Sequence, residues 1–151
     1  MMTLQTMKRL SGLVLLMAIN SYAQMTPVGT WHSIDDKTGE AKAEIHIVEK
    51  DGVLTGRVTK SLRTDAAAKK ICDACQDDRK GKEIIGMDII RGVKIDPANE
   101  FTWGNGGQIL DPENGKDYTV KMMPKEGGKK LLVRGYIGPF YRTQTWLRVQ
   151  Q

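Results

Sequence analysis

The first residues to consider for a chemical role are two cysteines, Cys72 and Cys75, which form a single C-x-x-C motif. Three interpretations are open: a disulfide that pins the surrounding loop, part of a metal site, or a redox-active pair. A zinc site would need about two more ligands, and His32 and His46 stand apart on predicted strands without ligand spacing. A thioredoxin-type pair opens a helix in a strand–helix–strand unit, which the sequence does not show. We favour the disulfide and expect neither a metal ion nor a cofactor.

Familiar catalytic motifs are missing from the sequence. Neither histidine belongs to a nucleophile elbow, and there is no H-E-x-x-H motif, P-loop or dinucleotide-binding glycine motif. Acidic pairs such as Asp35–Asp36 and Asp77–Asp78 fall in predicted turns, where aspartate is favoured because it hydrogen-bonds the local backbone. We therefore assign no catalytic residues, and an enzyme is the least favoured of the function classes.

A set of aromatic and polar residues could instead bind a small ligand. Arg134 and Tyr136 alternate with Val133 and Gly135, so a charge and an aromatic ring share one face of a strand. An arginine beside an aromatic wall suits a carboxylate or phosphate head group. The same side chains could equally lie along the outer surface with their tips in water. The predicted ligand-binding residues are Trp103, Tyr118, Arg134, Tyr136, Arg142 and Gln144.

Short alternating runs of apolar and polar residues must position these side chains. Within residues 41–48 a period of two places Ala41, Ala43, Ile45 and Ile47 on one face, and Lys42, Glu44, His46 and Val48 on the other. This predicts a strand with one buried and one solvent-exposed face. Such runs recur between turns rich in Gly, Asp and Asn, which predicts an all-β fold, a small antiparallel barrel of about eight to nine strands. Residues 61–82 break the pattern and predict a loop with one short helical segment near residues 66–70. Tryptophan motifs around Trp31 and Trp146 predict that the first and last strands meet at a closed end.

The first 23 residues have the pattern of a signal peptide. Lys8 and Arg9 precede an apolar run over residues 10–19, which is shorter than the roughly 20 residues that cross a bilayer. Ser21 and Ala23 then supply small residues where a signal peptidase reads them. An uncleaved anchor is the alternative. We expect cleavage after Ala23, leaving residues 24–151 as one domain, periplasmic or secreted, without a transmembrane segment.

The charge of the mature chain is mild. Loss of Lys8 and Arg9 reduces the basic residues from 23 to 21 against 18 acidic ones, so the formal net charge falls from +5 to +3. A nucleic-acid-binding domain usually carries a strongly basic patch, whereas the charges of this chain are interspersed. We therefore expect no nucleic-acid partner, and the sequence leaves the oligomeric state open.

Several short motifs occur in the order that is typical of a known family. They include a terminal R-T-Q-T-W-x-R segment and a D-P-x-x-G-K-x-Y segment, together with G-x-W, the C-x-x-C loop, W-G-x-G-G and V-R-G-Y. Over nearly the whole mature chain, this set resembles the exported bacterial family called domain of unknown function 2147. The resemblance implies a lipocalin-like barrel with a cup. No activity is assigned to that family, so no catalytic residue carries over.

A more distant similarity to the lipocalins proper implies roles at the closed end. In that family a G-x-W tryptophan packs across the barrel floor, and an arginine of the last strand lies on it. Trp31 would be that tryptophan, and Arg148 or Arg142 that arginine, with Trp146 as a further structural residue. A guanidinium over an indole contributes roughly 0.5–2 kcal/mol, which would join the two ends of the chain.

These observations favour a non-enzymatic binder of a small amphipathic or acidic ligand in the cell envelope. Small barrels either fill their interior with side chains or hold one small ligand. The alternative is therefore an envelope surface-interaction or structural protein whose barrel is filled. An open cavity would favour the first reading, and a packed interior the second.

Overall fold

The computed structural model describes residues 25–66 and 68–150, and the predicted signal peptide lies outside them. The described residues form nine strands and one 3-10 turn, η1 (Glu126–Gly128). The strands are β1 (Gly29–Ile34), β2 (Ala41–Lys50), β3 (Val53–Ser61), β4 (Asp88–Asp96), β5 (Asn99–Asn105), β6 (Gln108–Asp111), β7 (Lys116–Lys125), β8 (Lys130–Ile137) and β9 (Phe140–Arg148).

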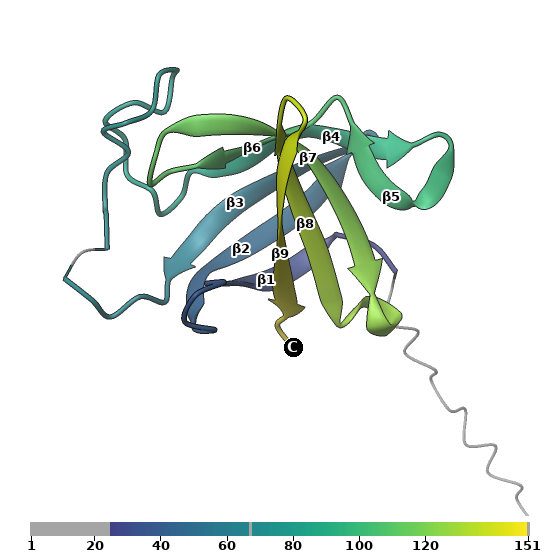
Figure 1. Cartoon of the computed structure of the whole chain (residues 1–151), viewed down its shortest axis with the longest axis horizontal. Coiled ribbons are helices and arrows are strands. Elements are labelled where there is room, and N and C mark those ends of the chain that lie inside the picture. Colours follow the sequence, from purple (N-terminus) through teal and green to yellow (C-terminus); the bar gives the residue numbers. More distant parts are fainter. Residues whose placement is uncertain (1–24, 67, 151) are drawn as a thin grey trace, which may run out of the picture.

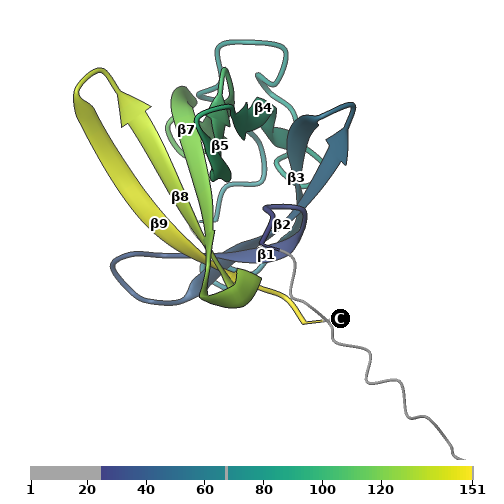
Figure 2. The ribbon, with the colours of Figure 1, turned by 90° about the vertical axis from the view of Figure 1, so that its right-hand side faces the viewer.

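The strands close into an antiparallel barrel, as the alternating pattern predicts (Figures 1 and 2). The order is β3-β2-β1-β9-β8-β7-β5-β4-β6, and the pairing of β3 with β4 completes the circuit. Both β5 and β6 pair with β4 and β7, so eight strands make the barrel and one is extra. The predicted barrel is therefore confirmed.

The first and last strands meet at the closed end of the barrel. Trp31 pairs with Arg148 in the β1–β9 ladder, and the guanidinium carbon of Arg148 lies 4.1 Å from the centroid of the Trp31 ring. The Trp31 side chain is fully buried, and its Nε1 donates a hydrogen bond to the carbonyl of Pro27 at 2.7 Å. Gly29 allows the close approach, since a side chain there would collide with the Arg148 guanidinium. Of the two arginines considered above, Arg148 is therefore the one on the tryptophan.

The long loop between β3 and β4, residues 62–87, carries the C-x-x-C motif. Cys72 and Cys75 form a disulfide and are fully buried, which confirms the first of the three interpretations. The Cys72 amide donates to the carbonyl of Lys82 at 2.9 Å, and the Gly81 amide donates to the carbonyl of Cys72 at 2.9 Å. The short helix expected near residues 66–70 is wrong: residues 62–66 and 68–70 contain only bends, a turn and irregular backbone.

A buried arginine fixes this loop to the barrel. Arg79 is only 4% exposed, and its Nη2 lies 2.6 Å from a carboxylate oxygen of Asp77 and 2.8 Å from those of Asp117 on β7. Its Nη1 donates to the carbonyl of Asp88 at 3.1 Å. The hydrogen bonds from Arg79 lower the pKa of Asp77 to about 2. The loop is thus held against β4 and β7 instead of standing free in solvent.

Candidate ligand-binding site

A cavity of about 850 Å³ opens at the end of the barrel opposite Trp31. The turn of residues 35–40, the loop of residues 62–87 and the β6–β7 turn of residues 112–115 contribute to its mouth. Figure 1 shows these segments gathered on the left of the view. The volume lies within the range of roughly 300–1,000 Å³ that is usual for small-molecule sites.

Apolar side chains from the inner face of the barrel line the depth of this cavity. They occupy alternate positions along their strands, so their side chains all point into the barrel and away from water. Trp146 is the largest of them, and its Nε1 donates to Oε1 of Gln144 at 3.1 Å, so its one polar group has a partner. These residues are Ile45, Val58, Ile89, Leu110, Val133 and Trp146.

The mouth, in contrast, is densely charged. Six basic residues and five acidic residues line it, so the basic side chains exceed the acidic ones by one. The basic residues are Lys37, Lys42, Arg63, Lys69, Lys70 and Arg142, and the acidic ones are Asp35, Asp65, Glu83, Asp111 and Glu113. The cavity therefore combines an apolar interior with a charged mouth.

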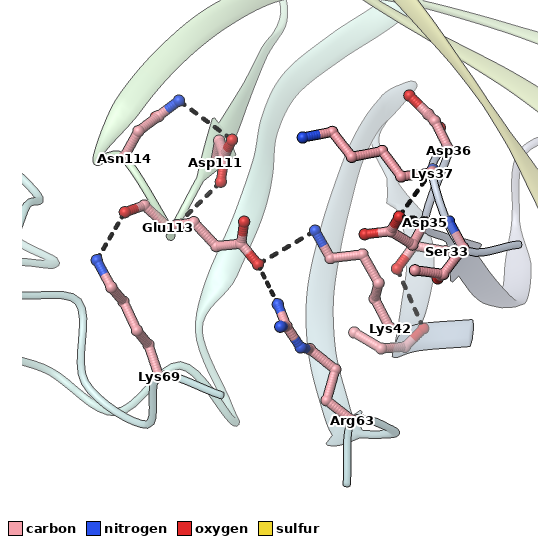
Figure 3. Close-up of polar contacts among 12 residues, drawn as sticks. Ser33, Asp35, Asp36, Lys37, Lys42, Arg63, Lys69, Asp111, Glu113 and Asn114 are labelled. Carbon is pink, nitrogen blue, oxygen red and sulfur yellow. Dashed lines mark hydrogen bonds and ion pairs between the residues drawn. The ribbon is translucent and has the colours of Figure 1, made fainter. Parts of the chain in front are cut away.

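Glu113 in the β6–β7 turn is the centre of the contacts at the mouth (Figure 3). Its Oε1 accepts a hydrogen bond from Nη1 of Arg63 at 2.6 Å and lies 3.2 Å from Nζ of Lys42. Its backbone carbonyl accepts a hydrogen bond from Nζ of Lys69 at 2.8 Å. Strand β2 and the loop of residues 62–87, both distant in sequence from Glu113, therefore meet at this turn.

A second ion pair crosses the mouth between β9 and the β1–β2 turn. Nε of Arg142 lies 2.6 Å from a carboxylate oxygen of Asp36, and this hydrogen bond raises the pKa of Arg142. The adjacent Asp35 accepts hydrogen bonds from the amides of Lys37 and Thr38, at 2.8 and 3.0 Å, which lower its pKa. Arg142 and Asp35 are therefore both charged at neutral pH.

Three of the six predicted ligand-binding residues line the cavity: Tyr118, Arg142 and Gln144. Tyr118 is oriented by Asn114, whose Nδ2 donates to the phenolic oxygen at 2.9 Å. Arg142 and Gln144 lie on the same side of β9 as Trp146, because alternate residues of a strand share a face. Whether these three bind a ligand stays a prediction.

The other three, Arg134, Tyr136 and Trp103, do not line the cavity. Arg134 donates from Nε to Oγ1 of Thr143 at 2.7 Å and lies over the Tyr141 ring at 4.5 Å, and the rings of Tyr136 and Tyr141 are 5.6 Å apart. The sequence predicts correctly that Arg134 and Tyr136 share a face, but the face is the outer one. Trp103 is buried in the core and pairs with Met122 across β5 and β7.

The inward face of β8 belongs instead to Val133 and Gly135. Gly135 fits there because Tyr118 leaves little room: a Cβ at this position would lie 3.2 Å from Cβ of Tyr118. The mouth residues Lys42, Arg63 and Glu113 escaped the sequence analysis, since an ion pair between residues 50 positions apart leaves no local pattern.

The geometry of this site is suited to binding. Within residues 25–66 and 68–150, no three His, Cys, Asp or Glu side chains are grouped so that they could hold a metal ion. In the same part of the chain, no helix is long and apolar enough to cross a membrane. The lining offers an apolar interior, the side chains of Tyr118 and Trp146, and a charged mouth.

Comparison with known proteins agrees with the barrel fold. The family model of uncharacterized proteins conserved in bacteria, DUF2147, matches residues 29–148. The chain belongs to the DUF2147 family. No curated protein matches the chain. A solved structure described as "Protein HP1028 from the human pathogen Helicobacter pylori belongs to the lipocalin family" has a TM-score of 0.66 at 15% identity, with 82% of each chain covered. This DUF2147 member therefore has a lipocalin-like fold.

Proposed function

We propose that this DUF2147 protein is an exported, non-enzymatic binder of a small amphipathic molecule with an acidic head group. One observation carries the proposal: a cavity of about 850 Å³ with an apolar interior opens through a charged mouth. A barrel of eight strands is wide enough to hold one small ligand. The tail would lie against the apolar wall that includes Trp146, and the head group would stay among the basic residues of the mouth.

The energetics of burial favour a ligand with a long apolar tail. Each buried methylene contributes about 0.8 kcal/mol, whereas loss of translational and rotational freedom costs about 4–15 kcal/mol. A tail of about five methylenes contributes only about 4 kcal/mol, which barely meets the lowest cost. A tail of about ten contributes about 8 kcal/mol, which exceeds the lowest cost by about 4 kcal/mol. A medium- to long-chain acid therefore fits the cavity best.

Two observations support a site of action outside the cytoplasm. Residues 1–23 have the order of charge, apolar run and small residues that is typical of a signal peptide. The disulfide between Cys72 and Cys75 lies in the loop that forms part of the mouth, and such bonds persist in oxidising compartments such as the periplasm. The ligand would then be a molecule of the cell envelope.

Calorimetric titration of the mature protein with dodecanoic acid tests this proposal. We expect binding tighter than about 1 mM, which corresponds to about −4 kcal/mol. Ala43 lines the cavity, so Ala43→Trp should fill part of it and weaken binding at least tenfold. Ala98, an exposed turn residue between β4 and β5, supplies the matched control, Ala98→Trp, which should bind like the wild type.

Two results would contradict the proposal. If dodecanoic acid and longer-chain acids all bind more weakly than about 1 mM, the cavity does not serve as a carrier site. Equal binding by Ala43→Trp and the wild type would place the ligand elsewhere on the molecule. Either result would favour the alternative of a surface-interaction protein, for which the exposed side chains of Phe140 and Tyr141 at the β8–β9 turn are the natural contact.

A further inference from the structure

We propose that Lys42 and Arg63 form the site for the carboxylate of the ligand, and that the Glu113 carboxylate occupies this site until a ligand displaces it. The inference rests on the proposed function and assigns its head-group site. Both cations contact a single oxygen, Oε1 of Glu113, from Nζ of Lys42 at 3.2 Å and Nη1 of Arg63 at 2.6 Å (Figure 3). The cavity mouth therefore already holds a carboxylate between two positive charges.

Arg63 is oriented for this task by a separate partner. Its Nε and Nη2 donate to the two carboxylate oxygens of Asp65 at 3.1 and 2.6 Å, a bidentate arrangement that fixes the plane of the guanidinium. Nη1 is left to point at the mouth, where Glu113 accepts its hydrogen bond. Removal of the Glu113 carboxylate would thus leave Arg63 in place as a donor for another acid.

The Glu113 side chain can leave without unfolding its turn. The turn is held by other groups: the Glu113 amide donates to Oδ1 of Asp111 at 2.9 Å, and the Gly115 amide donates to the Asp111 carbonyl at 2.8 Å. Lys69 binds the backbone carbonyl of Glu113, not its carboxylate. The Glu113 side chain is 47% exposed, and ion pairs with solvent-exposed partners are weak. A ligand carboxylate backed by a buried tail can therefore replace it.

The remaining basic residues of the mouth are less suited to the head group. Arg142 is engaged by Asp36 at 2.6 Å, and Lys69 by the backbone carbonyl of Glu113. Lys37 and Lys70 are exposed, where water and salt screen their charges. Lys42 and Arg63 are the two that converge on one point, and their side chains are only 25% and 30% exposed.

If the ligand carboxylate replaces that of Glu113, substitutions at this site should change the affinity for an acid but not for the corresponding alcohol. Glu113→Gln removes the competing charge and its two exposed ion pairs, so dodecanoic acid should bind at least about two- to fivefold tighter, the range expected for loss of one such pair. Binding of 1-dodecanol, which has the same chain without the charge, should stay unchanged. Arg63→Gln should weaken dodecanoic acid about tenfold, because a hydrogen bond to a charged group is lost, again without effect on 1-dodecanol.

Calorimetric titration of the mature protein with both compounds tests the inference. The matched control is Glu126→Gln at the first residue of η1. This change removes the ion pair in which Nζ of Lys130 lies 2.8 Å from Oε1 of Glu126, and the variant should bind both compounds like the wild type. If both compounds bind but Glu113→Gln gains no affinity for the acid, or gains equally for the alcohol, the inference is overturned while the proposed function stands. If neither compound binds the wild type, both are overturned.

Discussion

Replacement of Trp31 by alanine tests whether the two ends of the chain seal the barrel. Trp31 is fully buried, and truncation of a large core aromatic costs about 3–5 kcal/mol. The change also removes the contact with Arg148 at 4.1 Å, which contributes roughly 0.5–2 kcal/mol. Since these contributions overlap, we expect a loss near the upper end, about 5 kcal/mol, of the 5–15 kcal/mol that a domain typically has.

Trp31→Phe separates the packing from the hydrogen bond. Phenylalanine keeps an aromatic ring under Arg148 but cannot donate to the Pro27 carbonyl, which Nε1 of Trp31 reaches at 2.7 Å. We expect the free energy of unfolding to fall by about 1–3 kcal/mol, because the buried Pro27 carbonyl loses this hydrogen-bond partner. Phe140→Ala is the control, because its side chain is 77% exposed and should change stability by no more than about 0.5 kcal/mol.

Urea unfolding followed by far-ultraviolet circular dichroism measures these differences without relying on tryptophan emission. We expect the midpoints to fall in the order wild type and Phe140→Ala, then Trp31→Phe, then Trp31→Ala, with unchanged slopes. A loss below about 1 kcal/mol for Trp31→Ala would refute the reasoning. Equal losses for alanine and phenylalanine would assign the effect to the hydrogen bond and not to packing.

Three further predictions concern the leader, the loop of residues 62–87 and the β6–β7 turn that packs against this loop. Intact-mass measurement of protein from the envelope fraction should show cleavage after Ala23, and soluble protein that retains the leader would contradict it. Folding lowers the pKa of Asp77 from 3.8 to about 2, so the stability that its carboxylate contributes is present above about pH 4 and is lost between pH 4 and 2. When the free energy of unfolding is measured against pH, Asp77→Asn should lose about 1 kcal/mol less than the wild type over this range, a small value because solvent screens this exposed group. Equal profiles for the two proteins would refute this prediction. Gly115 has φ +72° and abuts the backbone of Ala74, so Gly115→Ala should cost at least about 1–2 kcal/mol in the same assay, and a neutral effect would contradict the packing.

Much of the barrel can be predicted from the sequence, because side chains along a strand are alternately buried and exposed. Residues 41–47 alternate between apolar and polar and lie within β2, and the C-x-x-C motif forms its disulfide. The tryptophan of the first strand and the arginine of the last are brought together. In each case the information is local or lies in a motif with a known geometry.

The site itself was only half predictable, for two physical reasons. Alternation tells which residues of β8 share a face, but not which face points inward, where Gly135 packs against the Tyr118 side chain. The contacts that build the mouth join residues far apart, as Arg63 and Glu113 do across 50 positions. No periodicity encodes such pairs.

Quenching of tryptophan emission by a brominated dodecanoic acid tests the central claim, binding inside the barrel, most directly. Of the three tryptophans, only Trp146 lines the cavity, whereas Trp31 and Trp103 are buried elsewhere. Bromine quenches an indole only at close range. We predict partial quenching in the wild type that disappears in Trp146→Phe while calorimetric binding persists. Binding without quenching in the wild type, or quenching that survives in Trp146→Phe, would contradict the account.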